Sequence, residues 1–164
     1  MFDSIHHITY LVWDLASVES YFQDHFDLQP IRKEDVGPGR SASISYQIGP
    51  TLLRFSEPAH TATMEYEQLR RSGGPVISHI GLGVANLADR SRGLKEAGVD
   101  FTQSKVMVSP HGGYKLIDIA AESSCGMRTQ NERFALSEMS PDSHLGIRLQ
   151  LCEDIVGAGT PSNA

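Results

Sequence analysis

Two histidines stand at corresponding places in a sequence that repeats itself once. His7 opens residues 7–15 (HITYLVWDL) and His79 opens residues 79–87 (HIGLGVANL), an offset of 72 residues without a gap. Histidine, isoleucine, valine and leucine recur at matching positions of the two copies. A neutral imidazole binds divalent metals, and near neutral pH it also accepts or donates a proton. The pair therefore indicates either a metal site or acid–base chemistry.

Each copy predicts a strand followed by a helix. Asp14 and Asn86 are suitable N-cap residues at the end of the two predicted strands. Apolar residues follow each cap at helical spacing, and Gly98 is placed to end the second helix. These apolar residues are Leu15, Val18, Tyr21, Phe22 and Phe26 in the first copy, and Leu87, Leu94 and Ala97 in the second.

Strand-like segments follow each predicted helix. In the first copy they are residues 41–48 and 51–55, joined by a turn at Gly49-Pro50. In the second copy they lie near residues 114–119 and 145–151. The sequence thus predicts two modules, about residues 4–71 and 76–153, which pack as one domain over residues 1–153 because each half alone leaves a sheet face uncovered. A short helix is expected at residues 65–71, a linking loop at 72–75 and a disordered tail at 154–164.

Strand alternation assigns the two faces of each predicted strand. One face carries apolar residues and must be buried against helices. The other face carries small and polar residues, which suits a concave ligand site, although the solvent face of an antiparallel sheet has a similar composition. The members of this second face are His7, Thr9, Ser43, Ser45, Gln47, His79, Gly81, Gly83, Gly146, Arg148 and Gln150.

The composition excludes several classes of partner. Among 164 residues there are 14 Lys and Arg against 20 Asp and Glu, and the net charge of −6 argues against a nucleic-acid surface. No apolar run approaches the length that a membrane span requires, and the N-terminus lacks the pattern of a signal peptide. We therefore expect a cytoplasmic protein that binds neither nucleic acid nor membrane, with Cys125 and Cys152 as free thiols.

The repeated strand and several short motifs resemble the vicinal-oxygen-chelate superfamily, which includes glyoxalases, bleomycin resistance proteins and extradiol dioxygenases. Within it the methylmalonyl-CoA epimerase family is nearest. Residues 54–58 resemble the close of the first module, 109–113 a glycine-rich loop, and 141–143 with 146–153 the turn and strand that close the second module. Residues 120–140 interrupt the resemblance. It implies an α+β fold in which two paired βαβββ modules form a curved mixed sheet around a pocket.

The resemblance also implies a set of metal ligands. In the superfamily a histidine opens each module and a carboxylate or glutamine closes it, and together they hold a divalent metal (Co, Ni, Zn, Mn or Fe). These positions fall on His7, His79, Gln150 and Arg54. A guanidinium has no lone pair to offer a metal, so the metal is absent unless Arg54 turns away. Gln130 is the alternative to Gln150, which we favour because its strand alternates cleanly.

Other residues are weaker candidates. His6 is the alternative first ligand, but strand alternation places it on the opposite face. Arg148 and the loop residue His111 are candidates for substrate binding together with Arg54. A general base is not identified: Glu57 stands at a strand end, and for Glu34-Asp35, which resembles an acidic stretch before the second strand of the epimerases, we favour a solvated loop.

Three functions stay open. The first is an isomerase or lyase of the glyoxalase or epimerase type, in which a metal polarises the carbonyl of a small carbonyl or thioester substrate. The second is a metal-free enzyme that binds an anionic small molecule through Arg54 and Arg148, with a histidine as acid or base. The third is a drug-sequestering protein similar to the bleomycin resistance members. Superfamily members often dimerise, so a homodimer is compatible with all three.

Overall fold

The computed structural model describes residues 2–35, 41–59, 63–108, 114–119 and 148–154. The chain packs as two compact units. We call His7–His79 the N-terminal unit, and Met1–His6 together with Ile80–Ala164 the C-terminal unit.

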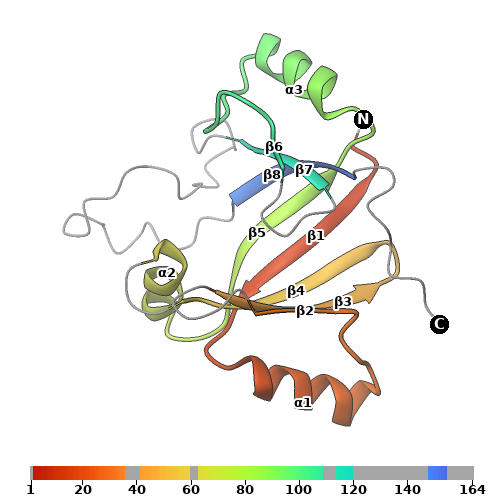
Figure 1. The fold of residues 1–164 in the computed structure, drawn as a ribbon. Coiled ribbons are helices and arrows are strands. Elements are labelled where there is room, and N and C mark those ends of the chain that lie inside the picture. Colours follow the sequence, from red (N-terminus) through yellow and green to blue (C-terminus); the bar gives the residue numbers. More distant parts are fainter. Residues whose placement is uncertain (1, 36–40, 60–62, 109–113, 120–147, 155–164) are drawn as a thin grey trace. The chain divides into compact units, whose positions relative to one another are not determined.

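The N-terminal unit contains one βαβββ module and a second helix (Figure 1). Its strands are ordered β2-β3-β4-β1, with β1 parallel to β4 and the other neighbours antiparallel. The sheet is therefore mixed, and the α+β class expected from the sequence is confirmed. The elements are β1 (Ser4–Leu11, within this unit from residue 7), α1 (Leu15–Phe26), β2 (Arg32–Asp35), β3 (Ala42–Ile48), β4 (Thr51–Glu57) and α2 (Met64–Ser72).

The C-terminal unit repeats the same order of elements. Its strands are ordered β5-β8-β7-β6, and the pairs β6·β7 and β7·β8 are antiparallel. The elements are β5 (Val76–Gly83, within this unit from residue 80), α3 (Leu87–Glu96), β6 (Met107–Val108), β7 (Tyr114–Asp118) and β8 (Arg148–Asp154).

One backbone hydrogen bond recurs in both units and fixes which residues correspond. Val12 N–H donates to the Ser56 carbonyl at 3.0 Å, and Val84 N–H, 72 positions later, donates to the Cys152 carbonyl at 2.9 Å. Ser56 and Cys152 therefore occupy the same place in the two modules. Two residues earlier on β4 and β8, Arg54 corresponds to Gln150, as the resemblance implied.

Aromatic packing determines which face of the N-terminal sheet is covered. Phe22 of α1 stacks on Tyr46 with ring centroids 4.4 Å apart, and its ring lies 5.3 Å from that of Phe55. Tyr10 stacks on Phe55 at 5.7 Å. Helix α1 thus packs on the apolar side of the strands, and this packing leaves the residues of opposite parity for the other face. In the C-terminal unit, Val84, Leu87, Ile117 and Ile119 form the corresponding apolar cluster.

The two predicted N-caps are confirmed. Asp14 accepts hydrogen bonds from the backbone N–H groups of Ala16 and Ser17 at 2.9 and 3.2 Å. The Ser17 hydroxyl and these N–H groups hold the pKa of Asp14 below its usual value. Asn86 accepts from the Asp89 N–H at 3.1 Å, and Gly98, in the left-handed region at φ 86°, follows the end of α3 as expected.

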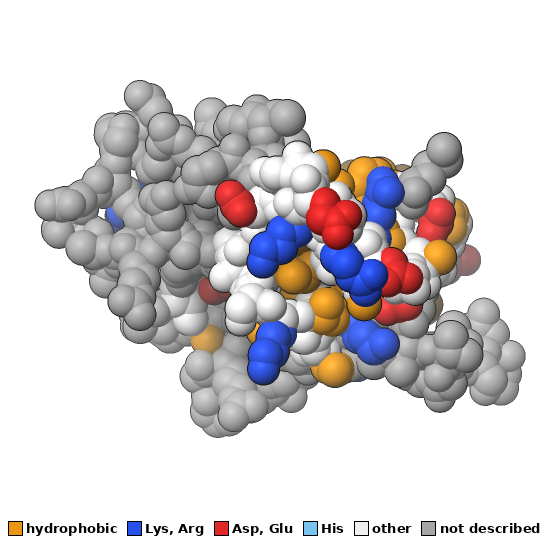
Figure 2. Space-filling view, turned by 90° about the horizontal axis from the view of Figure 1, so that it is seen from above, with side chains coloured by type: hydrophobic (Ala, Val, Ile, Leu, Met, Phe, Trp, Pro, Cys, Tyr) orange, Lys and Arg blue, Asp and Glu red, His pale blue; other side chains and the backbone are white. Residues whose placement is uncertain are grey.

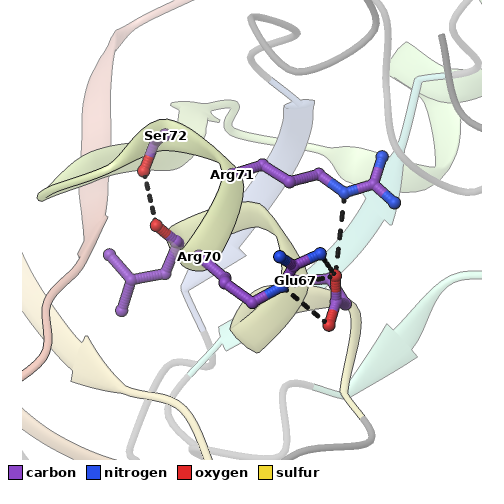
Figure 3. Close-up of polar contacts among 5 residues, drawn as sticks. Glu67, Arg70, Arg71 and Ser72 are labelled. Atoms are coloured by element: carbon purple, nitrogen blue, oxygen red, sulfur yellow. Dashed lines mark hydrogen bonds and ion pairs between the residues drawn. The ribbon is translucent and has the colours of Figure 1, made fainter. Parts of the chain in front are cut away.

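Helix α2 is held at both ends by local contacts. Thr63 caps its first turn by accepting a hydrogen bond from the N–H of Tyr66 at 3.2 Å. Near its end, the Glu67 carboxylate pairs with Arg70 at 2.8 Å and with Arg71 at 3.7 Å (Figure 3). Gly73 terminates the helix with φ 73°, which an L residue with a side chain adopts only with strain. The predicted helix at residues 65–71 is thereby confirmed.

The boundaries differ from the sequence expectations at two places. Arg32–Asp35 forms strand β2, so the interpretation of Glu34-Asp35 as a solvated loop is wrong. Asp154 is the last residue of β8, whereas residues 155–164 of the predicted tail lie outside the described residues.

Basic and acidic side chains are interspersed on the face drawn in Figure 2. Within the described ranges, every helix is too short or too polar to cross a membrane.

The Asn86 cap can be tested by substitution. We expect Asn86→Ala to lower the free energy of unfolding by about 1 kcal/mol, since the Asp89 N–H loses its acceptor. Asn86→Ser keeps an oxygen acceptor for the Asp89 N–H without placing a second carboxylate beside Asp89, and its stability should lie close to that of the wild type. Urea denaturation followed by circular dichroism measures both variants, and equal midpoints for the wild type and Asn86→Ala would show that the cap carries no stability.

Candidate functional site

The N-terminal unit has a buried polar face opposite the α1 side of its sheet. Strand register aligns Thr9, Arg54, Ser45 and Arg32 in one row across β1, β4, β3 and β2. Directly opposed residues point to the same side of a sheet, and His7 shares that side because it lies two residues before Thr9. His7, Thr9, Ser45 and Arg54 are all no more than 4% exposed. We call these four residues the polar face.

Arg54 lies inside this face and does not turn out to solvent. It is 3% exposed, and its Nε–H donates to the Ser45 hydroxyl at 3.4 Å. Its register partner on β1 is Thr9, whose Oγ1 is buried without a hydrogen-bond partner among the described residues. The guanidinium is therefore flanked on both neighbouring strands by residues with a neutral hydroxyl.

The structure brings the two repeat-related histidines together. The rings of His7 and His79 lie with centroids 5.0 Å apart and planes at 87°. His7 is fully buried and His79 is 9% exposed. His79 Nδ1 lies 3.2 Å from the hydroxyl of Ser78. His6, the alternative ligand, is only half-buried, and a nitrogen of its ring lies within 4.8 Å of the Cys152 Sγ in the C-terminal unit.

A carboxylate lies on the same side of the sheet. Glu34 pairs with Ser43 in the β2·β3 register, one row along from Ser45. Its Oε1 lies 2.6 Å from the Nε of Arg32, and its Oε2 accepts a hydrogen bond from the Ser43 hydroxyl at 3.2 Å. The side chain is 14% exposed. Glu34 is therefore a held but accessible carboxylate, about two strand spacings (~10 Å) from Arg54.

Glu57, the other base considered from the sequence, has a structural role. Its Oε2 accepts a hydrogen bond from the backbone N–H of Leu15, the first residue of α1, at 3.1 Å. A carboxylate at a helix N-terminus satisfies an N–H that has no partner within the helix. Glu57 thus joins the end of β4 to the start of α1, and Glu34 is the better candidate for a base.

The C-terminal unit places a different pair at the corresponding positions. Gln150 on β8 is 4% exposed, and its Oε1 has no hydrogen-bond partner in the described part of the chain. Its register partner on β7 is Asp118, which is 3% exposed. Gln103 binds Asp118 reciprocally: Gln103 Nε2 donates to the carboxylate at 2.5 Å, and Gln103 Oε1 accepts from the Asp118 N–H at 2.8 Å.

Sequence reasoning missed Asp118 as a candidate site residue. Asp118 stands opposite Gln150 in the β7·β8 register, just as Ser45 stands opposite Arg54 in the β3·β4 register. Strand alternation therefore places Asp118 on the same face as Gln150 once this register is known. The sequence showed the strand at residues 114–119, but the connection between β7 and β8 is too long for their register to be read. His111 and Gln130 lie outside the described residues, and of Arg148 only the backbone, at the start of β8, is described.

Among the described residues of the N-terminal unit, the positions that the resemblance assigns to metal binding do not form a complete set of ligands for a divalent metal. Two imidazoles with ring centroids 5.0 Å apart fit a metal site. The residue at the closing position is Arg54, which is permanently cationic and has no lone pair. Because it is buried on the same side of the sheet as His7, its charge opposes that of a nearby metal ion.

Comparison with known proteins gives one family match. The sequence model described as "Glyoxalase/Bleomycin resistance protein/Dioxygenase superfamily" matches residues 4–126. No curated protein sequence matches the chain.

Several solved structures share the fold at low sequence identity. A hypothetical protein of Bacillus halodurans C-125 is 18% identical with a TM-score of 0.71, over 96% of this chain and 98% of that one. Methylmalonyl-CoA epimerase of Mycobacterium tuberculosis is 14% identical with a TM-score of 0.71, over 94% and 89%. A Streptomyces coelicolor methylmalonyl-CoA epimerase variant in complex with 2-nitronate-propionyl-CoA is 14% identical with a TM-score of 0.71, over 95% and 97%.

The contact between Gln103 and Asp118 makes a testable contribution to stability. Gln103→Leu should lower the free energy of unfolding by about 1–3 kcal/mol, because a buried carboxylate and a backbone N–H each lose a partner. Ser104→Ala, at the exposed neighbouring position, serves as the control and should change little. Urea denaturation of the wild type and the two variants measures these free energies. An unchanged midpoint for Gln103→Leu would contradict a stabilising role of the contact between Gln103 and Asp118.

Proposed function

Because the chain belongs to the glyoxalase/bleomycin resistance protein/dioxygenase superfamily, we propose that it is an isomerase or lyase that moves a proton next to the carbonyl of a small thioester or carbonyl compound. The observation that carries this proposal is Glu34. Its carboxylate lies on the same side of the N-terminal sheet as His7 and Arg54, and its oxygens are held by Arg32 and Ser43. Proton abstraction requires such a positioned base.

In the proposed reaction, Glu34 accepts the proton from the carbon next to the carbonyl. The electron pair of the broken C–H bond moves toward the carbonyl oxygen, so an enolate develops. If Glu34 returns its proton to a neighbouring atom, an isomer forms. If a second acid, such as a water molecule, donates a proton to the same carbon from the other side, the epimer forms and Glu34 releases its proton to solvent. Epimer and isomer formation both begin with removal of the same proton, so several small thioester or carbonyl compounds fit this chemistry.

The developing negative oxygen needs hydrogen-bond donors. His7 and His79 are buried with their rings 5.0 Å apart, and a ring N–H of either can donate to the oxygen of an enolate. A divalent metal would supply the same stabilisation as a Lewis acid. The proposed steps use the side chains of this chain alone, because Arg54 occupies the position where a metal ligand is required.

The epimerase neighbours support a thioester as the first substrate to examine. They share the fold with this chain, and one of them is named in complex with 2-nitronate-propionyl-CoA. A CoA thioester has a carbonyl with an acidic neighbouring C–H bond, which is the chemistry that Glu34 can serve.

Hydrogen exchange tests the proposed base whichever product the reaction forms. The enzyme is incubated in D₂O with methylmalonyl-CoA, propionyl-CoA or glutathione hemithioacetals, and deuterium at the carbon next to the carbonyl is measured by mass spectrometry. We expect exchange with at least one compound, and Glu34→Gln should slow it by on the order of 10²- to 10⁴-fold, the usual contribution of a general base. Glu96→Gln, at an exposed position of α3, should leave the rate unchanged.

Two results would contradict the proposal. Wild-type rates in Glu34→Gln, with circular dichroism showing an intact fold, would remove Glu34 from the mechanism. Absence of exchange in the wild type with every compound would reject proton transfer next to a carbonyl as the reaction.

A further inference from the structure

We propose that Arg54 binds a carboxylate group of the substrate and so acts as a permanent cation where the superfamily fold commonly supplies a metal ligand. This inference rests on the proposed function and names its substrate class: a small carbonyl or thioester compound that also carries a carboxylate.

The repeat shows how unusual the chemistry at this position is. The recurring hydrogen bonds Val12–Ser56 and Val84–Cys152 make Arg54 the counterpart of Gln150. Gln150 offers an amide oxygen, which accepts hydrogen bonds and can ligate a cation, whereas Arg54 offers only donors and a positive charge. The same position of the module therefore suits a cation where it holds Gln150 and an anion where it holds Arg54.

The residues beside Arg54 favour an anion at this place. Its register neighbours, Thr9 on β1 and Ser45 on β3, carry neutral hydroxyls. The Glu34 carboxylate on this side of the sheet lies one row further and pairs with Arg32 at 2.6 Å. The Glu57 carboxylate binds the first N–H of α1. A substrate carboxylate beside Arg54 would thus meet hydroxyl groups on both neighbouring strands, with no repelling carboxylate in its own row.

The polar face also offers donors of suitable geometry. The Nε–H of Arg54 donates to Ser45 at 3.4 Å, and the terminal nitrogens of an arginine can bind a carboxylate through two parallel hydrogen bonds. The Thr9 hydroxyl is buried beside Arg54 and has no hydrogen-bond partner among the described residues. It can donate a further bond to the same carboxylate.

A bound carboxylate also defines the position of the reacting carbon. Arg54 and Glu34 lie about two strand spacings, roughly 10 Å, apart on the same side of the sheet. A small molecule held by its carboxylate at Arg54 can extend across β3 toward Glu34. The distance between its carboxylate and its acidic C–H bond would then determine which substrates react.

Calorimetric titration of the wild-type protein with malonate, with its neutral analogue malonamide and with Co²⁺ tests the inference. We expect malonate to bind, malonamide not to bind, and Co²⁺ not to bind stoichiometrically. Stoichiometric Co²⁺ without malonate binding, or equal binding of malonate and malonamide, would overturn it. This measurement needs no variant and no turnover, so a protein that binds malonate but exchanges no protons contradicts the proposed function alone.

Variants at position 54 sharpen the result. Arg54→Gln should weaken malonate binding roughly 10- to 100-fold, the loss expected for a charged hydrogen-bond partner. Arg54→Glu should lose malonate binding and gain one Co²⁺ per chain, because a carboxylate then joins His7 and His79. Arg71→Gln, which removes an arginine paired with Glu67 in the same unit, should bind malonate as the wild type does. Wild-type malonate affinity in a folded Arg54→Gln protein would overturn the assignment.

Discussion

The burial of the Arg54 guanidinium is the constraint on which the candidate site depends. A charged group taken out of water requires polar surroundings, and here Ser45 and Thr9 provide hydroxyls on the two neighbouring strands. These residues are held in place because β1, β4 and β3 keep a regular register. A one-residue slip of any of these strands would replace the hydroxyls with the apolar residues of the other face. The pairing of these strands therefore determines where the polar side chains lie.

The apolar side of the same strands explains why that pairing is stable. Phe22 of α1 stacks on Tyr46 and contacts Phe55, so burial of aromatic area on one side holds the polar side chains on the other. Glu57 links the end of β4 to the first turn of α1. Along β1, β3 and β4, successive side chains point alternately to the aromatic core and to the polar face.

Much of this arrangement could be predicted from the sequence. The 72-residue offset between His7 and His79 predicted that a strand and a helix recur, as they do in β1–α1 and β5–α3. The resemblance to the superfamily implied that the two histidines share one site, and their rings lie 5.0 Å apart. The caps Asp14 and Asn86 predicted where α1 and α3 begin. The position of Glu34 could not be predicted, because four polar residues, Arg32–Asp35, carry no apolar alternation to identify a strand. Asp118 was missed for another reason: its partner Gln150 lies 32 residues away, so its place depends on long-range pairing.

A crystal structure of the wild-type protein with bound malonate would show whether Arg54 binds a carboxylate. We expect a carboxylate of malonate about 2.7–2.9 Å from the guanidinium nitrogens of Arg54, within hydrogen-bond distance of Thr9 Oγ1. A metal ion bound to His7 and His79 with Arg54 turned away, or malonate found only elsewhere on the protein, would contradict it.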